Sequence, residues 1–431
     1  MILRLSSSAA RASLVALALL LAVFLSYFSI RNARSEHLAG LATSDGFSRA
    51  VQLEPGNARN WFLLGRYLLY NLEDPDAPRA IRAYQTSLSL DPRSADTWLD
   101  LAAAYESQGA LAPARDAFRN AQQAYPLSAD VAWRYGNFLL RQGELDAAFA
   151  EIRHAVELDP QRAAEAFSRC MRAHPDLHDI LDRVLPASRG VYVDVMSDLL
   201  GDGKTDDALV VWSRLAALHP QLPIRDVYQF VDALMQKRQL ALARHIWDQA
   251  AGFAGLTPLQ VPPGSLVWDG GFESGVSGEG FAWRLPPLTG GVQTSLDESE
   301  KHSGKHSLRL TFDGKHNVNF LDVCQYVVVQ PSTAYRFSAW VRTRALTTDQ
   351  GIRFYLQPIL SSGSPPISTA DLRGTQPWTK IEMPWTSGKD VNELQLCVQR
   401  NASDSSDNKI QGAAWIDDVA LTPEAPENPK P

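Results

Sequence analysis

Hydrophobic positions follow two different periods along the 431 residues, and the period changes near residue 258. Before this point, apolar residues recur at intervals of three and four, which is the pattern of amphipathic helices. Farther along, short apolar runs alternate with polar positions residue by residue, as in half-buried strands. The pattern predicts a helical domain over 38–256, a proline-rich linker over 257–264 and a β domain over 265–424.

The helical part contains an internal repeat. Its amphipathic runs end in prolines spaced by 37, 34 and 34 residues, namely Pro55, Pro92, Pro126 and Pro160. A period of 34 residues is typical of repeats of two helices that stack into a solenoid. Each proline prevents the helix before it from continuing, so the next repeat starts anew.

The clearest repeat covers residues 95–128. One helical stripe, three and four residues apart, is formed by Trp98, Leu101 and Tyr105. Small residues, Ala102 and Ala114, mark the place where its two helices must approach closely. With Phe118, Ala121 and Pro126 added, these positions resemble the tetratricopeptide repeat pattern.

The resemblance implies a protein or peptide partner that lies along the inner helices. Repeat phasing places Arg66, Tyr70, Asn137 and Arg141 near this groove. The alternative is that each of these residues simply belongs to a solvated helical face. Solenoids of this type present concave binding surfaces, which favours binding over catalysis.

Residues 14–30 form an uncharged apolar run that follows a short N-terminal tail, 1–13. Its length suits a single membrane-spanning helix, and no small-residue cleavage site follows directly. We therefore expect a retained signal anchor in the inner (cell) membrane. The alternatives are a cleaved signal peptide and a buried core helix; a core helix fits poorly, because the run is N-terminal and apolar all round. In a bacterium, the bulk of the chain would then be periplasmic or extracellular.

The net charge of −7 argues against a nucleic-acid partner, because such proteins need a basic surface. Of the three cysteines, Cys170 lies in the helical part, whereas Cys324 and Cys397 lie in strand-like runs. The latter two could pair in an exported protein or remain buried thiols. The composition of the tail, 425–431, predicts disorder.

Four phrases in the β domain carry a second resemblance: "WDGGFESG", "HSGKHSLRL", "YRFSAWVRT" and "AAWIDDVALTP". Together they resemble carbohydrate-binding modules of the family 4, 9 and 22 type, which are galactose-binding-like jelly rolls. Asp269 stands where the opening phrase usually has asparagine. The expected fold is thus multidomain, with an N-terminal transmembrane helix, an all-α solenoid and an all-β jelly-roll sandwich.

This second resemblance also implies a structural calcium ion. Glu273 and Asp418 would supply side chains, and Gly271 and Lys305 would supply backbone carbonyls. Strand alternation predicts that Asp417 and Asp418 point to opposite faces, so that only one of them can be a ligand. The alternative is that Glu273 and Asp418 merely accept hydrogen bonds from the adjacent turn.

A polar sheet face is the candidate site for a polysaccharide. Alternation in "IRFYLQP" and "LQLCVQR" collects Arg353, Tyr355, Gln357, Gln395 and Gln399 on one face. Rings, amides and a guanidinium group suit the recognition of sugars. An ordinary solvent-facing sheet surface would alternate in the same way, so this alternative stays open.

No catalytic constellation stands out: neither a pair of carboxylates, a G-x-S-x-G elbow, a phosphate loop nor an H-E-x-x-H helix is present. Trp340 and Trp415 are interpreted as core packing residues. We therefore predict a non-catalytic membrane-anchored scaffold that binds a protein partner and a polysaccharide, in exopolysaccharide assembly or export at the bacterial envelope. The alternatives are a purely protein–protein envelope scaffold without a glycan site and, third, a glycan-processing enzyme.

Overall fold

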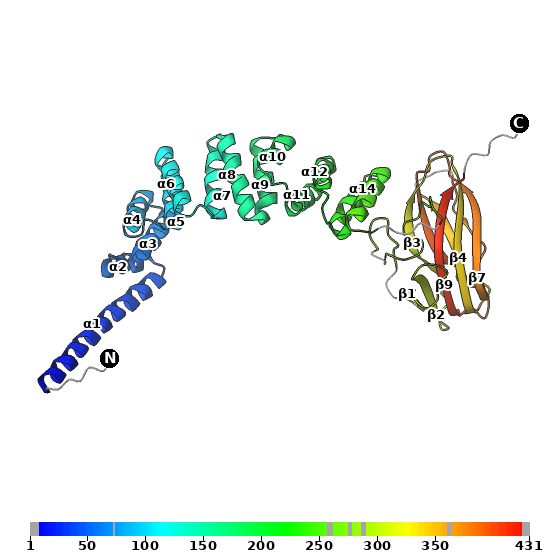
Figure 1. Ribbon diagram of the computed structural model, residues 1–431, viewed down its shortest axis with the longest axis horizontal. Coiled ribbons are helices and arrows are strands. Elements are labelled where there is room, and N and C mark those ends of the chain that lie inside the picture. The colour runs from blue at the N-terminus through cyan, green and yellow to red at the C-terminus, as the bar shows by residue number, and fades with distance from the viewer. Residues whose placement is uncertain are drawn as a thin grey trace. The chain divides into compact units, whose positions relative to one another are not determined.

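The computed structural model describes residues 8–71, 74–256, 262–274, 278–285, 290–359 and 364–424 (Figure 1). The chain divides into two compact units, Met1–Pro186 and Ala187–Pro431. This division does not coincide with the linker expected at 257–264, because the last helices group with the β domain. The expected tail, 425–431, lies outside the described residues, as does most of that linker.

The first unit is built from helices joined by short turns. They are α1 (Ser8–Gly40), α2 (Ser44–Leu53), α3 (Ala58–Tyr70), α4 (Ala77–Leu90), α5 (Ala95–Ser107), α6 (Leu111–Ala124), α7 (Ala129–Arg141), α8 (Leu145–Leu158), the 3₁₀ turn η1 (Pro160–Arg162), α9 (Ala163–Ala173) and α10 (Leu177–Arg183). The predicted helical repeats are confirmed in this unit.

The same kind of tryptophan–carbonyl hydrogen bond occurs in successive repeats, and small residues allow paired helices to pack closely. The indole Nε1 of Trp61 donates to the carbonyl of Pro55 at 2.9 Å, and Trp98 donates to Pro92 at 3.0 Å. A Cβ at Gly65 would lie 2.6 Å from the ring of Tyr84, so only glycine allows this approach of α3 and α4. The repeated residues therefore serve helix packing and the start of each helix, rather than the binding of a ligand.

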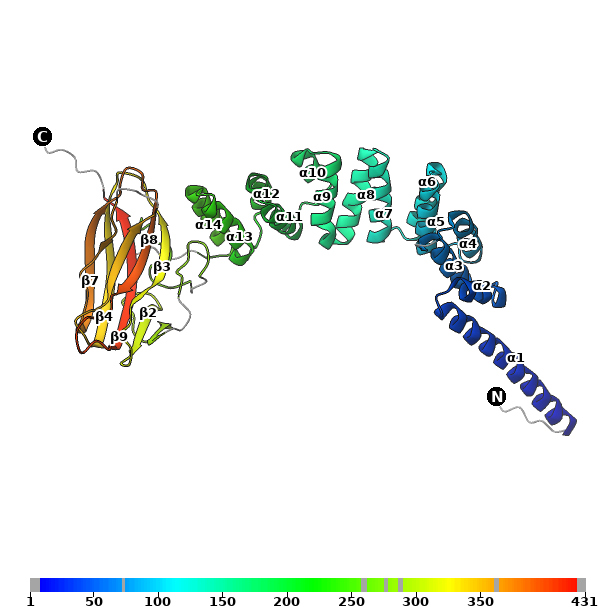
Figure 2. The same ribbon diagram turned by 180° about the vertical axis from the view of Figure 1, so that it is seen from behind.

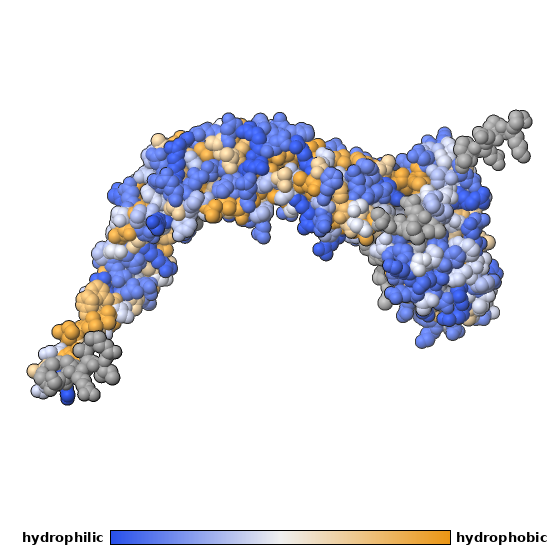
Figure 3. All heavy atoms as spheres, viewed as in Figure 1, coloured by the Kyte–Doolittle hydropathy of each residue, from blue (hydrophilic) through white to orange (hydrophobic). Residues whose placement is uncertain are grey.

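Helix α1 carries the apolar run and continues directly into the first repeat. Its residues from 14 to 30 are largely exposed, and α1 is long and apolar enough to cross a membrane (Figure 3). Near its C-terminal end, Ser35 donates to the carbonyl of Ala50 at 3.3 Å and accepts from Asn60 at 2.8 Å. These buried bonds join the candidate membrane helix to α2 and α3.

The second unit contains helices followed by a β-sandwich (Figure 2). Its helices are α11 (Arg189–Gly201), α12 (Thr205–Ala217), the 3₁₀ turn η2 (Ile224–Val227), α13 (Tyr228–Gln236) and α14 (Leu240–Phe253). Its strands are β1 (Val292–Asp297), β2 (Ser307–Asp313), β3 (Phe320–Val328), β4 (Ala334–Leu346), β5 (Arg353–Pro358), β6 (Ile367–Ser368), β7 (Gly374–Thr386), β8 (Glu393–Arg400) and β9 (Gln411–Pro423).

Two antiparallel sheets form the predicted sandwich, with strand orders β1-β2-β9-β4-β7 and β3-β8-β5-β6. The core between them contains alternate residues of each strand, such as Phe354 and Leu356 of β5, which are fully buried. Cys324 and Cys397 lie opposite each other on β3 and β8 and form a disulfide.

Trp340 is only half-buried and does not lie in this core, so its interpretation as a core packing residue was wrong, whereas Trp415 is 1% exposed and is a buried packing residue as predicted. Trp340 alternates with the buried Ala339 and Val341 and thus lies on the outer face of its sheet. The ring of His302 stacks on it at 3.9 Å. Trp415 is also on the outer face, where the guanidinium groups of Arg309 and Arg344 lie over its ring and help to bury it.

Helix α14 packs against the segment that opens the sandwich. The ring of Trp247, which is 1% exposed, lies edge-on against Trp268 at 5.6 Å and Phe281 at 6.2 Å. Arg244 donates to the carbonyl of Leu266 at 3.0 Å. The last helical pair and the sandwich therefore share a buried aromatic interface within one compact unit.

Candidate functional site

The predicted polar face is the outer surface of the four-stranded sheet. Register places Arg353 beside Gln399, and Gln357 beside Gln395, on β5 and β8. Between these two rows, Tyr355 of β5 lies beside Cys397 of β8, and Cys397 lies beside Cys324 of β3. All five predicted residues are thus brought together, and we call this surface the platform.

Hydrogen bonds hold part of the platform in place. Arg353 donates to the side chain of Gln350 at 2.7 Å and lies 3.8 Å from the carboxylate of Asp371. Ser368 of β6 donates to the amide oxygen of Gln399 at 3.3 Å. Gln357, by contrast, is exposed, and Gln395 is half-buried. Their amides can offer hydrogen-bond donors and acceptors to a ligand.

Two further residues extend the platform, Tyr326 on β3 and Arg284 beyond it. Tyr326 lies opposite Gln395 and is half-buried on the outer face. Arg284 pairs with Cys324 through two backbone hydrogen bonds of 2.8 and 3.2 Å, and its guanidinium group lies 4.6 Å from the centre of the Tyr326 ring. Alternation could have identified Tyr326, but no pattern marked Arg284, which lies in an irregular segment.

The residues expected to hold calcium also meet in the structure. Glu273 Oε1 accepts from the backbone N–H groups of Lys305 and His306 at 2.7 and 3.1 Å. Asp418 accepts from the hydroxyl of Ser303 at 2.7 Å and lies 2.6 Å from His302 Nδ1. Glu273 and Asp418 thus accept hydrogen bonds from the loop of residues 302–306, which is the role that the alternative to calcium binding assigned to them.

The prediction that Asp417 and Asp418 diverge was wrong. Asp417 Oδ2 accepts from the backbone N–H groups of His302 and Ser303, so both carboxylates reach the same loop. The reason is a bulge: the pairing of β4 with β9 slips at this point, and Asp418 has φ +48°. Within the described residues, however, no three acidic, histidine or cysteine side chains are grouped closely enough to hold a metal.

Burial perturbs the carboxylates at this edge of the sandwich. It raises the pKa of Asp417 to about 6, and the neighbouring charge of Asp418 acts in the same direction. Burial also raises the pKa of Asp269, which caps the backbone N–H groups of Glu273 and Ser274 at 2.8 and 2.7 Å. Asp269 has φ +48°, a conformation that asparagine and aspartate adopt more readily than most other non-glycine residues, so its place in the opening phrase has a backbone reason.

The four predicted groove residues fall into two groups in the first unit. Arg66 lies 3.3 Å from the buried carboxylate of Asp100, and the hydroxyl of Tyr70 donates to it at 3.5 Å. Arg134 of α7 binds the same carboxylate at 3.1 Å. This group therefore connects α3, α5 and α7, which gives it a structural role as well as an exposed face.

Asn137 and Arg141 line a hollow of about 220 Å³ together with Trp133, Arg134 and Arg169. Arg141 makes two bonds to Glu106, at 2.8 and 2.9 Å, and Arg169 donates to the amide oxygen of Asn137 at 3.1 Å. The hollow thus contains several arginines whose charges are partly balanced by acidic neighbours.

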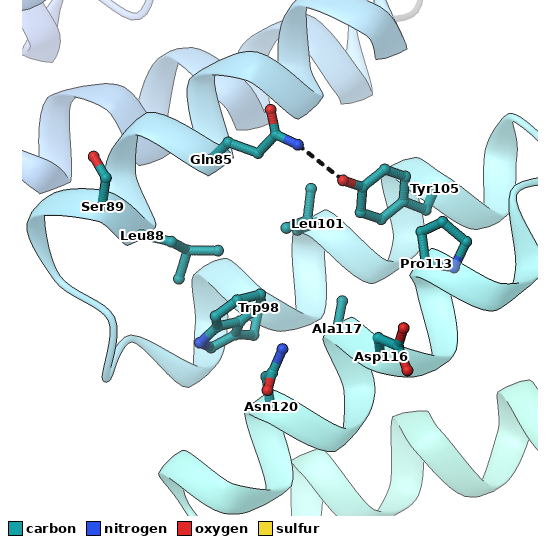
Figure 4. A pocket seen from close by; sticks show the side chains of 10 residues that line it. All are labelled: Gln85, Leu88, Ser89, Trp98, Leu101, Tyr105, Pro113, Asp116, Ala117 and Asn120. Atoms are coloured by element: carbon teal, nitrogen blue, oxygen red, sulfur yellow. Dashed lines mark hydrogen bonds between the residues drawn. The ribbon is translucent and has the colours of Figure 1, made fainter.

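A larger hollow of about 500 Å³ lies between α4, α5 and α6 (Figure 4). Trp98, Leu88 and Leu101 supply its apolar lining, and Gln85 donates to the hydroxyl of Tyr105 at 2.9 Å on one side. None of the four predicted groove residues lines it.

The families that match this chain agree with the fold of its two kinds of domain. Residues 264–406 match the model of a carbohydrate binding domain, and residues 72–126 and 113–163 match that of the tetratricopeptide repeat. The chain therefore carries protein-interaction repeats and a carbohydrate-binding domain, as both resemblances implied. Neither of these families is catalytic. Among curated proteins, none matches the chain.

Several solved structures are similar to parts of the chain in fold. The TPR protein YrrB, described as having an unusual peptide-binding site, is 17% identical over 49% of this chain and 94% of its own, with a TM-score of 0.26. The second family 16 carbohydrate binding module is 18% identical over 36% and 99%, with a TM-score of 0.27. TmCBM61, solved with β-1,4-galactotriose, is 19% identical over 37% and 99%, also with a TM-score of 0.27.

Proposed function

We propose that the chain is a non-catalytic, membrane-anchored scaffold whose sandwich binds a polysaccharide through the platform. The observation that carries the proposal is the convergence of Arg353, Tyr355, Gln357, Gln395 and Gln399 on one sheet face. The match of this domain to a carbohydrate-binding family supports the same reading. A role in exopolysaccharide assembly or export follows from joining such a domain to protein-interaction repeats.

The platform combines two kinds of sugar contact. The Tyr355 ring offers an apolar face with a hydroxyl at its rim, which suits stacking on a pyranose ring. The amides of Gln357 and Gln395 each supply donors and an acceptor within two residue positions of this ring. Polysaccharide hydroxyls need both, because each hydroxyl donates one hydrogen bond and accepts others.

The cell envelope is the proposed location. Helix α1 is apolar and exposed, as a membrane anchor requires, although a signal sequence has the same properties. The disulfide between Cys324 and Cys397 supports an oxidising compartment for the sandwich, since disulfides are rare in a reducing cytosol. Together these features favour a periplasmic or extracellular bulk on a single-pass anchor in the cell membrane.

The repeats are proposed to hold a protein or peptide partner along α3, α5 and α7. Arg66, Tyr70, Asn137 and Arg141 would meet it there, because each belongs to an inner helix. Calcium is proposed at the edge of the sandwich, held by Glu273 and Asp418 with the carbonyls of Gly271 and Lys305. The Oδ1 atoms of Asp417 and Asp418 lie close to Gly271, beside the Cγ of Glu273, and this supports the site because calcium takes oxygen ligands.

The test of the platform is binding of the full chain, in detergent micelles, to a panel of polysaccharides. Tyr355→Ala should abolish binding of the polysaccharide that the unchanged chain retains. Tyr125→Ala, which removes an exposed tyrosine from the first unit, is the matched control and should bind normally. Failure of the folded chain to bind any member of the panel would favour a purely protein–protein scaffold.

A further inference from the structure

The last helical pair is fixed against the edge of the platform. Gly280 lies so close to Trp247 of α14 that a Cβ there would overlap the indole ring. The guanidinium group of Arg244 lies over the rings of Trp268 and Phe281 at 5.8 and 5.6 Å. The segment 278–285, which carries Arg284, is therefore held directly against the helices.

Helix α13 brings a carboxylate to this segment. Burial raises the pKa of Asp232, and the neighbouring Glu279 raises it further, while Arg284 and a hydrogen bond from the backbone of Gly280 lower it. Asp232 thus lies next to the segment that carries Arg284. Its side chain also shares a hydrogen bond with Glu279, and Asp232 is half-buried rather than enclosed.

The turn between α13 and α14 also carries a charge that acts on the same sheet. Glu393, at the start of β8, lies on the outer face with Gln395, two residues away. Burial raises the pKa of Glu393, and the positive charge of Arg238, in the turn between α13 and α14, lowers it. Asp232 thus lies beside the segment that carries Arg284, and the charge of Arg238 acts on Glu393 at the outer face of the sheet.

Arg284 and Tyr326 connect Asp232 to the platform. Register places Tyr326 in one row with Gln395 and Gln357, and Arg284 lies over the Tyr326 ring. Tyr326 lies two strands across the sheet from Tyr355, about 10 Å at the usual strand spacing, and is also two residues farther along the strands. A ligand in contact with both rings must be longer than a single sugar.

We propose that Asp232, Arg284 and Tyr326 form a second subsite of the platform, which binds a distant sugar unit of the same polysaccharide chain. A carboxylate accepts and a guanidinium group donates charge-assisted hydrogen bonds, which suits neighbouring hydroxyls on one ring. The last repeat helices would then determine which chains bind, as well as support the sandwich. This inference rests on the proposed glycan-binding function.

The experiment measures affinity of the full chain in micelles for a length series of oligosaccharides cut from the polysaccharide that it binds. Asp232→Asn and Tyr326→Ala should each lower the affinity for the longest oligosaccharides by about fivefold or more, because each change removes one or more hydrogen bonds or contacts. The shortest ligands that still bind should be unaffected. Asp206→Asn, an exposed change on α12, should alter neither.

The outcomes separate this inference from the proposed function. Loss of all binding in Tyr355→Ala, with unchanged affinities in Asp232→Asn and Tyr326→Ala, would overturn the second subsite alone. Equal weakening at every length would overturn it too, because a distant subsite cannot act on short ligands. Thermal melting of each variant excludes loss of the fold, and the two changes lie on different elements, so agreement between them supports the subsite.

Discussion

Asp417 and Asp418 are consecutive residues, yet both of their carboxylates accept hydrogen bonds from Ser303. The backbone N–H of Ser303 donates to Asp417 at 3.0 Å, and its hydroxyl donates to Asp418 at 2.7 Å. The β-bulge at Asp418 thus places two acidic groups against one loop. A bound cation would relieve the repulsion between them.

Calcium should therefore stabilise the sandwich. At a concentration one hundred times the dissociation constant, a single site would add about 2.7 kcal/mol to the free energy of unfolding. We expect the unfolding midpoint of the full chain to rise with calcium and to fall on chelation. Differential scanning calorimetry measures both shifts.

Glu273→Gln should remove the response to calcium, whereas Glu382→Gln, an exposed change on β7, should retain it. A midpoint that ignores calcium and chelator alike would instead assign Glu273 and Asp418 to hydrogen bonding of the loop alone.

The contact between Gly280 and Trp247 should be sensitive to a single methyl group. Gly280→Ala places a Cβ against the indole ring and also strains a backbone at φ +51°. Gly278→Ala strains a similar backbone, at φ +78°, but meets open space, so it isolates the strain. We expect Gly280→Ala to lower the free energy of unfolding by about 1–3 kcal/mol more than Gly278→Ala. Equal losses, measured by urea denaturation, would show that the ring moves aside at no cost.

The disulfide should contribute strongly to the stability of the platform. It joins residues 73 positions apart, and the chain-entropy model assigns about 4 kcal/mol to a loop of that length. Reductant should lower the unfolding midpoint of the unchanged chain by an amount similar to the double change of Cys324→Ala and Cys397→Ala. The double variant serves as the control, because reductant should not affect it further.

Much of the fold could be predicted from local patterns. Paired helices need residues that start each helix and small residues where two helices pack closely. The regularly spaced prolines, Trp61, Trp98 and Gly65 meet these needs. The platform could be predicted too, because β5 and β8 are regular strands in which alternate residues share a face.

Other features depend on irregular backbone or on distant contacts. Strand alternation predicted that the side chains of Asp417 and Asp418 point to opposite faces, because it assumes a regular strand. A one-residue bulge makes the strand irregular at this point. Trp340 was placed in the core by its position on a predicted strand, although His302, from a distant loop, covers its ring on the outer face. Trp247 lies on α14, and its packing against Trp268 joins two segments that no local sequence period relates.

Asp297 should make the sandwich sensitive to acid. Burial opposes its ionisation, but hydrogen bonds from Ser299, from the Trp415 indole at 2.9 Å and from the Glu300 backbone outweigh burial and hold its pKa well below the ordinary 3.8. Because the folded state binds the proton less tightly than the unfolded state, the ionised carboxylate adds stability above pH 3.8. That contribution declines as the pH falls toward the folded-state pKa.

Asp297→Asn should thus cost about 2 kcal/mol of unfolding free energy at pH 7, the scale of hydrogen bonds to a charged group. The difference from the unchanged chain should shrink at pH 2. Asp390→Asn, an exposed change in the same sandwich, should cost little at either pH. Urea titrations at both pH values test this, and a difference that stays constant with pH would mean that the asparagine loses packing geometry rather than charge.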